Sequence, residues 1–234
     1  MVNVTRATRW VALFCLCALS LSCREDGDTT VDPQPIPFSP KFVAGETYVY
    51  DAVALDEFGY MIPSTRSRAS WKVLSTGTTL PGFSSVTTIL DSASILRDTV
   101  GVYDTVMVAS TPSGDLYRFG LMATIARIRK QPVPEDRWEC IAAFSSGSGS
   151  SWVVGYQDYG RSQPVYGRIA GVTDMFTVSV KGQLTVFPAY RVDLSGVEFD
   201  YSFWVADAPA AFLLFRLEPN MTIGGAQLTL SDIR

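Results

Sequence analysis

Two acidic side chains, Glu198 and Asp200, come closest to a catalytic pattern in this sequence. They alternate with Val197, Phe199 and Tyr201, and residues two apart in a strand point to the same face of a sheet. Carboxyl groups held near one another could serve glycoside hydrolysis or bind Ca²⁺. The same alternation is typical of an ordinary strand with one solvated face, which is the interpretation we favour. We therefore assign no catalytic residue and no metal ligand.

The absence of histidine narrows the available chemistry most. It removes the usual general base near neutral pH, the Ser-His-Asp triad and every histidine-containing zinc site. The run Ser146–Ser150 lacks the helix that follows a nucleophile elbow and the lysine of a phosphate-binding loop, so we expect a plain loop there. We predict that the protein is not an enzyme and needs no cofactor. The alternative is an envelope hydrolase that acts on glycans through a carboxylate pair.

Aromatic side chains on predicted strands are the best candidates for ligand binding. If the sheet is open and curved, Trp71, Trp152, Tyr201 and Trp204 would line an apolar cavity for an acyl chain or another apolar ligand. If the sheet is closed, the same side chains form the core, because aromatic residues dominate core burial. We favour the core and keep these four residues as the candidate binding set.

The N-terminal residues have the composition of a secretory signal. The leader contains Arg6 and Arg9 and no acid, and Trp10–Leu19 is an unbroken apolar run. A positively charged start followed by 7–15 apolar residues is typical of a signal peptide, whereas a membrane-spanning helix needs about 20. The alternative is an uncleaved anchor or a buried helix.

Cys23 directly follows this leader. The preceding residues Leu19–Ser22 resemble the lipobox of bacterial lipoproteins, although Ser20 and Leu21 stand in reversed order. The resemblance implies that residues 1–22 are removed and that Cys23 carries acyl chains such as palmitate, so that the membrane is a partner of the chain. Ordinary secretion with cleavage nearby is the alternative. Arg24-Glu25-Asp26 is also similar to the surface-export signal of some Gram-negative lipoproteins, and this resemblance implies an outer-membrane location. The alternative is that these charges only solvate a tether.

The charge balance argues against nucleic acid as a partner. Removing the leader takes away two arginines and no acid, which leaves a net charge of −6. The sequence contains no run of five basic residues, and a phosphate-neutralising patch is therefore not expected.

With Cys15 and Cys17 in the leader and Cys23 acylated, Cys140 is left without a disulfide partner and is expected to be a buried thiol.

Composition divides the chain into three segments. Residues 1–22 are the expected signal peptide, and residues 23–40 form an acidic, proline-rich tether whose prolines favour an extended conformation. Residues 41–234 form one β-rich extracytoplasmic domain.

Short segments rich in branched and aromatic residues recur through that domain. In residues 66–73, for example, Arg68 and Lys72 alternate with Trp71 and Val73, as in a half-solvated strand. The ambiguous Leu121–Lys130 fits a short helix or an edge strand. The predicted strands are 47–53, 66–73, 86–90, 102–108, 116–119, 138–144, 152–156, 175–180, 184–187, 190–194, 198–206, 212–218 and 226–230. We therefore predict an all-β fold: an antiparallel curved sheet, half-barrel or sandwich of roughly ten or more strands, with at most one short helix besides the leader.

Two of these predictions concern hairpins. Residues 175–180 and 184–187, joined by Lys181-Gly182, form a predicted tight hairpin. Residues 138–144 and 152–156, joined by a Ser/Gly loop, form a predicted wide one.

The C-terminal half resembles a pattern found in bacterial lipoproteins and periplasmic proteins of unknown function. It is carried by Val186-Phe187-Pro188-Ala189, by Trp204-Val205-Ala206 and by the closing strand Phe212–Glu218. Such domains are similar to the half-barrel of lipoprotein carrier and receptor proteins. The resemblance implies a curved sheet with an apolar concave face and a binding or structural role with an apolar ligand, a lipid or an envelope protein. It supplies no catalytic residue.

Overall fold

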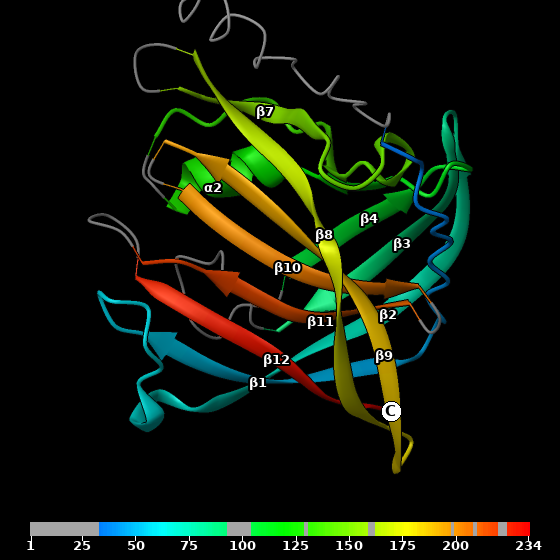
Figure 1. Ribbon diagram of the computed structural model, residues 1–234, viewed down its shortest axis with the longest axis vertical. Coiled ribbons are helices and arrows are strands. Elements are labelled where there is room, and N and C mark those ends of the chain that lie inside the picture. Colours follow the sequence, from blue (N-terminus) through cyan, green and yellow to red (C-terminus); the bar gives the residue numbers. More distant parts are fainter. Residues whose placement is uncertain are drawn as a thin grey trace, which may run out of the picture. The chain divides into compact units, whose positions relative to one another are not determined.

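One twelve-stranded sheet makes up most of the protein (Figure 1). The computed structural model describes residues 33–92, 104–128, 131–158, 162–197, 199–207, 210–219 and 224–234, all within the unit Pro33–Arg234. The strand order is β6-β5-β4-β3-β2-β1-β12-β11-β10-β9-β8-β7. Neighbouring strands are antiparallel, apart from a short parallel contact between the ends of β12 and β8. The predicted antiparallel all-β fold is confirmed.

The elements have the following bounds. The strands are β1 (Thr47–Leu55), β2 (Ser67–Leu80), β3 (Phe83–Asp91), β4 (Asp104–Ser110), β5 (Leu116–Phe119), β6 (Trp138–Ala142), β7 (Ser151–Asp158), β8 (Ser162–Val180), β9 (Gln183–Gly196), β10 (Phe199–Asp207), β11 (Ala210–Leu217) and β12 (Gly225–Ile233), the helix is α2 (Leu121–Ile128), and two single 3₁₀ turns are η1 (Pro63–Thr65) and η2 (Phe144–Ser146).

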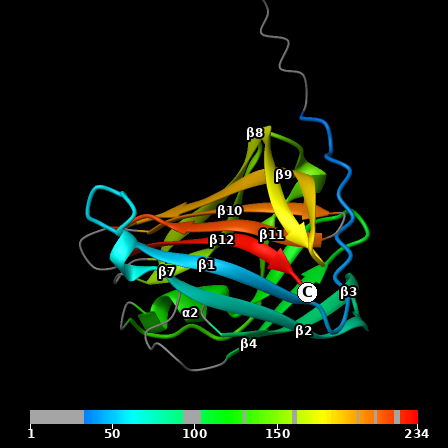
Figure 2. The same ribbon diagram turned by 90° about the horizontal axis from the view of Figure 1, so that it is seen from below.

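The sheet curls until its two ends meet, which makes it barrel-like (Figures 1 and 2). Strand β6 lies against β7, and the indole Nε1 of Trp152 donates to the carbonyl of Cys140 at 2.8 Å. No strand ladder joins β6 and β7 in the described residues. The predicted wide hairpin is therefore wrong, because these two segments are the closing ends of the sheet.

Period-two alternation places the core inside this curl. Along β2, Ala69, Trp71 and Val73 are buried while Arg68 and Lys72 are exposed, as the sequence predicted. Each large apolar side chain that is fully buried stabilises the fold by about 1.5–3 kcal/mol. The inward face of the sheet is therefore the main source of stability.

The tight hairpin between β8 and β9 is confirmed. Val180 pairs with Gln183, and Lys181 and Gly182 have φ of 51° and 84°. Positive φ at both central residues is typical of a type I′ turn, whose twist matches the flanking strands. The hairpin extends past the end of β10 toward the end of β12 (Figure 1).

The ambiguous segment that begins at Leu121 is the helix α2. Its described residues end at Ile128, and Leu121, Met122 and Ile125 are buried at helical spacing. The alternation that favoured an edge strand fails here because these apolar side chains pack on one side of a helix.

The proline-rich segment before β1 packs on the folded unit. Phe38 and Pro40 are buried, and the ring of Phe38 stacks on Phe144 at 3.9 Å. The backbone N–H of Ile36 donates to the carbonyl of Phe144 at 2.9 Å. Residues 33–40, expected to be part of a tether, are thus part of the folded unit.

Candidate functional site

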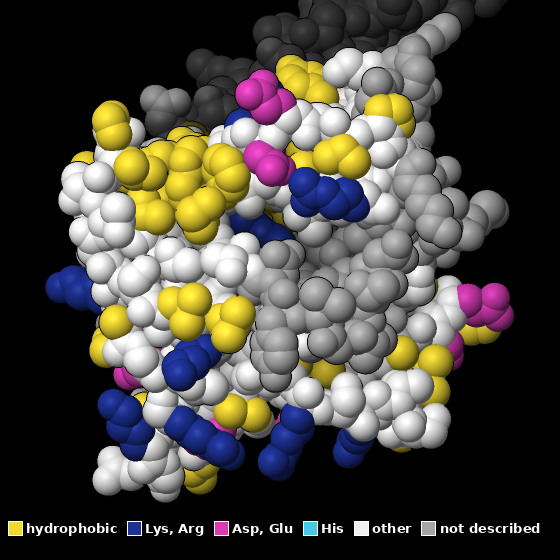
Figure 3. Space-filling model, turned by 180° about the vertical axis from the view of Figure 1, so that it is seen from behind, with side chains coloured by type: hydrophobic (Ala, Val, Ile, Leu, Met, Phe, Trp, Pro, Cys, Tyr) yellow, Lys and Arg dark blue, Asp and Glu magenta, His cyan; other side chains and the backbone are white. Residues whose placement is uncertain are grey.

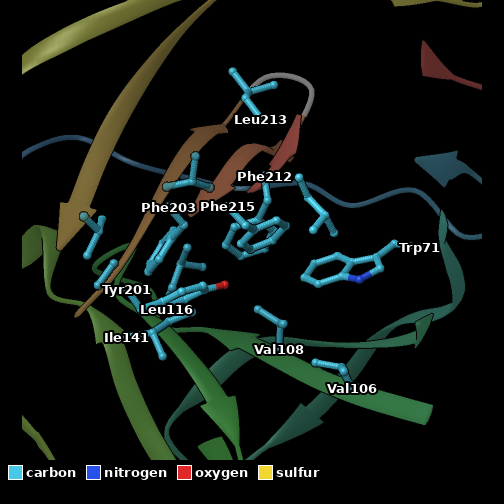
Figure 4. Close-up of a cluster of buried hydrophobic side chains, with 14 of the residues drawn as sticks. Trp71, Val106, Val108, Leu116, Ile141, Tyr201, Phe203, Phe212, Leu213 and Phe215 are labelled. Carbon is cyan, nitrogen blue, oxygen red and sulfur yellow. The ribbon is translucent and has the colours of Figure 1, made fainter. Parts of the chain in front are cut away.

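Aromatic rings fill the interior of the curled sheet (Figure 4). Trp71 of β2 meets Phe215 at 4.9 Å and Phe212 at 5.5 Å between ring centroids. On β10, Tyr201 stacks over Phe215 at 6.2 Å. Trp71 and Tyr201, two of the candidate binding residues, are therefore core residues.

The space left between these rings is small. A cavity of about 20 Å³ lies among them, lined by Trp71, Tyr201, Arg118 and their apolar neighbours. This volume holds about one water molecule, whereas pockets for drug-sized ligands reach several hundred Å³. An acyl chain does not fit in this cavity, and Trp71 and Tyr201 are not the walls of a ligand chamber here.

Two tyrosines of the interior, Tyr50 and Tyr201, are kept neutral by their burial. The hydroxyl of Tyr50 donates to the carbonyl of Phe212 at 3.0 Å, and burial raises the pKa of Tyr50 well above its ordinary value. Burial also raises the pKa of Tyr201, with Arg118 acting in the opposite direction and Asp91 in the same one. Both phenols thus stay neutral near pH 7 and cannot act there as phenolate bases or nucleophiles.

The two remaining candidate tryptophans lie apart from the interior cavity. Trp152 of β7 is half-buried, and its ring lies against Gly167 of β8, where any Cβ would clash with it. Trp204 of β10 donates to the carboxylate of Asp174, and the guanidinium of Arg191 stacks 5.1 Å from its ring centroid. The four candidate residues therefore do not form one site.

A larger pocket lies beside α2, at the closing end of the sheet. It has a volume of about 190 Å³ and lies between Met122, Ile125 and Ala126 of the helix, the segment Gln131–Pro134, and Tyr156 and Gln157 of β7. An engineered apolar cavity of about 150 Å³ is large enough to bind benzene. The pocket can therefore hold a single ring or a short hydrocarbon segment.

Gln157 is the most buried of the polar residues that line this pocket, beside Gln131 and Tyr156. Its side chain is 5% exposed, and neither its amide nitrogen nor its amide oxygen has a hydrogen-bond partner in the described part of the chain. A buried polar group left unpaired costs about 1–3 kcal/mol, and such groups in native proteins call for an explanation. The amide oxygen of Gln157 lies against Gly196 of β9, where an added Cβ would be 2.8 Å away, so Gln157 borders the pocket with its amide buried behind the lining.

Glu139 of β6 holds the helical wall of the pocket in place. Its carboxyl Oε2 accepts the N–H of Leu121 at 3.0 Å, and Oε1 lies 3.8 Å from Nε of Arg137. Burial raises the pKa of Glu139, although the N–H groups at the start of α2 and the guanidinium of Arg137 lower it. A negative charge is favourable at a helix N-terminus, so Glu139 fixes α2 to the sheet.

Close packing against β7 positions the same helix. A Cβ on Gly155 would lie 2.5 Å from Cγ of Met122, so only glycine lets the helix approach this strand. No sequence pattern identifies Gln157, because a register shift between Val153 and Gly155 changes which residues of β7 point inward. An acidic residue between Trp138 and Cys140 in an apolar strand was a usable signal for Glu139.

Several predictions concern residues outside the described structure. Cys23 and Glu198 lie there, so neither the lipid attachment nor the carboxylate pair is described. Asp200 accepts a hydrogen bond from Ser195 at 2.6 Å.

Within the described ranges, no cluster of three or more His, Cys, Asp or Glu side chains suits a metal ion. Cys140 is a free thiol, and burial raises its pKa to about 12.

No protein-family model and no curated protein matches the chain. Two solved structures align with most of it, each at 10% sequence identity. One, from Bacteroides fragilis, is described as an exported protein with a YmcC-like fold and aligns over 84% of this chain and 98% of its own, at a TM-score of 0.45. The other, described as a lipoprotein from Parabacteroides distasonis, aligns over 86% and 100%, at a TM-score of 0.41. In the described residues, no helix is long and apolar enough to cross a membrane.

Proposed function

We propose that this protein is a lipid-anchored binding protein of the bacterial cell envelope. Its ligand is small, with a ring or short hydrocarbon segment and one amide, carbonyl or hydroxyl group, and the pocket beside α2 holds it. The observation that carries this proposal is a pocket of about 190 Å³ bordered by Gln157, whose unpaired amide is buried behind the lining and reaches a ligand when the side chain turns toward the pocket.

The energetics favour such a ligand over a purely apolar one. The side chains of Met122, Ile125 and Ala126 supply apolar wall, which contributes roughly 25 cal/mol per Å² of apolar surface removed from water. A ligand group that pairs with Gln157 also relieves the cost of an unpaired buried amide. Selectivity therefore comes from Gln157, and affinity comes mainly from the apolar wall.

The leader and Cys23 support an envelope location. A positively charged start, a short apolar run and a cysteine after Ser22 support export followed by acylation. The segment Arg24–Asp26 supports an outer-membrane location. One acyl chain gives only marginal membrane binding, so stable attachment of the folded unit requires more than one.

Benzene and benzamide test the pocket directly. Both have the same ring, but only benzamide can pair with Gln157. In methyl and side-chain amide NMR of the full chain, both are expected to shift the Met122 methyl signal, and only benzamide the Gln157 amide. The extra hydrogen bonding is expected to make benzamide bind about 5-fold more tightly, as one neutral hydrogen bond of about 1 kcal/mol does.

The variant Gln157→Leu provides the control. It retains the apolar wall, so benzene should still bind, while the preference for benzamide should disappear. The methyl signal of Met175, an exposed residue of β8 outside the lining of this pocket, should not move. If neither probe shifts Met122, or if Gln157→Leu keeps the preference, the proposed site is wrong.

A further inference from the structure

One edge of the β8–β9 hairpin has no strand beside it in the described structure. Strand β9 pairs with β8 from Gln183 to Ser195, but it pairs with β10 only from Tyr190 onward. The tip of β8 is joined to β12 through Ser179 and Val180. Residues Gln183–Ala189 therefore have one paired edge and one edge that no described strand covers.

The outward face along this edge is apolar. Leu184 is 80% exposed and Val186 is 56% exposed, and both lie on the face opposite to the buried Phe187. On the adjoining strand, Met175 is 66% exposed on the same outward face. Natural proteins usually protect strand edges with charges, yet no charged residue occurs between Gly182 and Tyr190.

The position of Pro188 indicates which backbone groups face the open edge. Pro188 pairs with Met175 of β8, and a proline is tolerated in a strand where its missing N–H would point away from the neighbour. No register shift interrupts the ladder between Pro188 and Gln183. Because alternate residues of an antiparallel strand bond to the same side, the N–H and C=O groups of Val186 and Leu184 point to the open edge.

We infer that this edge pairs with the same edge of a second copy of this chain. With a two-fold axis at Thr185, Leu184 of each copy faces Val186 of the other, and each such pair exchanges two backbone hydrogen bonds. Leu184 and Val186 then also meet on the outward face. Lys181 falls opposite Ala189, so no like charges oppose one another. The edge is thus complementary to itself, as a two-fold interface requires.

Cysteine cross-linking of the full chain tests this dimer. The axis places the two copies of Thr185 in a pair that is not hydrogen-bonded, with Cα atoms about 4.5 Å apart, and disulfides form across 4.4–6.8 Å. A single strand edge is a small interface, and oxidation captures the dimer covalently. In a background in which Cys15, Cys17, Cys23 and Cys140 are all replaced by Ser, Thr185→Cys is expected to give a dimer band on non-reducing gels after mild oxidation.

Thr177→Cys is the matched control. Thr177 is exposed on β8 and pairs with Val186 of its own chain. In the dimer, the two Thr177 residues would therefore lie three strand spacings apart, about 14 Å. It should give at least ten-fold less dimer than Thr185→Cys. Adding Leu184→Lys and Val186→Lys to Thr185→Cys should abolish the band, whereas adding Met175→Lys should not. Circular dichroism verifies that each variant is folded.

Three results would overturn the inference. The first is a folded Thr185→Cys variant that gives no homodimer band. The second is an equal yield from Thr177→Cys. The third is cross-linking of Thr185→Cys to a different protein instead of to itself, which would assign the edge to another partner.

Discussion

Buried polar side chains are the chemically distinctive residues of this protein. Gln157 is buried and unpaired at the border of the pocket beside α2, and Glu139 lies buried against the first turn of α2. Burying either group is costly, and core packing alone would be served as well by leucine. Glu139 offsets this cost by accepting the N–H of Leu121 at the start of α2. We assign Gln157 to ligand binding.

The raised pKa of Glu139 gives a prediction about pH. A carboxyl whose pKa is higher in the folded state binds its proton more tightly there, so its contribution is fully present below the unfolded pKa and is lost as pH rises through the folded pKa. Glu139→Gln removes this titration. The unfolding free energy of the native chain minus that of the variant should therefore be larger at pH 5 than at pH 7.

Urea unfolding of both proteins at pH 5, 6 and 7 measures this difference. Glu135→Gln, at an exposed position two residues before Arg137, controls for the loss of a surface charge and should show a smaller change. A difference that grows as pH rises would contradict the assignment, because it would mean that the protein environment stabilises the ionised carboxylate.

For individual residues, the sequence predicted more about the core than about the candidate site. The alternation around Trp71 indicated the inward residues of β2 correctly. The same logic could not identify Gln157, since one register shift in β7 reverses the direction of the residues that follow it. Tyr201 and Trp204 cannot line one cavity, because residues three apart in a strand lie on opposite faces.

Among the elements, the segment before β1 shows how a long-range contact can override local composition. Its prolines favoured an extended tether, but Phe38 lies on Phe144 and Tyr190, which are more than a hundred residues away. No local pattern encodes such a contact. The β8–β9 hairpin was predictable because a two-residue turn determines its own register.

Gly114 is the position where this segment fits most tightly. Its φ is +88°, and an added Cβ would lie 2.0 Å from the carbonyl oxygen of Phe38. Gly114→Ala should therefore displace Phe38. The loss combines about 1–2 kcal/mol for a left-handed non-glycine residue with about 1.5–3 kcal/mol for the exposed phenylalanine.

Gly82→Ala separates these two effects. Gly82 has nearly the same φ, +87°, but no atom lies within 4 Å of its would-be Cβ. Only the backbone cost should therefore appear in its unfolding free energy. Limited proteolysis should cut the N-terminal segment faster in Gly114→Ala than in Gly82→Ala, and equal rates would mean that Phe38 stays in place.

For the whole molecule, closure of the sheet decides where function can lie. Because β6 meets β7 and aromatic rings fill the interior, ligand sites are confined to the ends and the outer surface. Figure 3 shows hydrophobic side chains gathered in patches on one outer face, with Lys and Arg side chains spaced along its lower rim. The strand periodicity predicted an all-β fold. It could not distinguish a closed sheet from an open one, because closure depends on contacts between the two ends of the sheet.

The proposed anchor yields the last prediction. If Cys23 is acylated, the native chain should partition into the detergent phase of Triton X-114, whereas Cys23→Ala should stay in the aqueous phase. Cys140→Ala changes the thiol of β6 and should partition like the native chain. Mass spectrometry of the processed N-terminus should find the added acyl mass only when Cys23 is present, and equal partitioning of Cys23→Ala and native protein would refute the anchor.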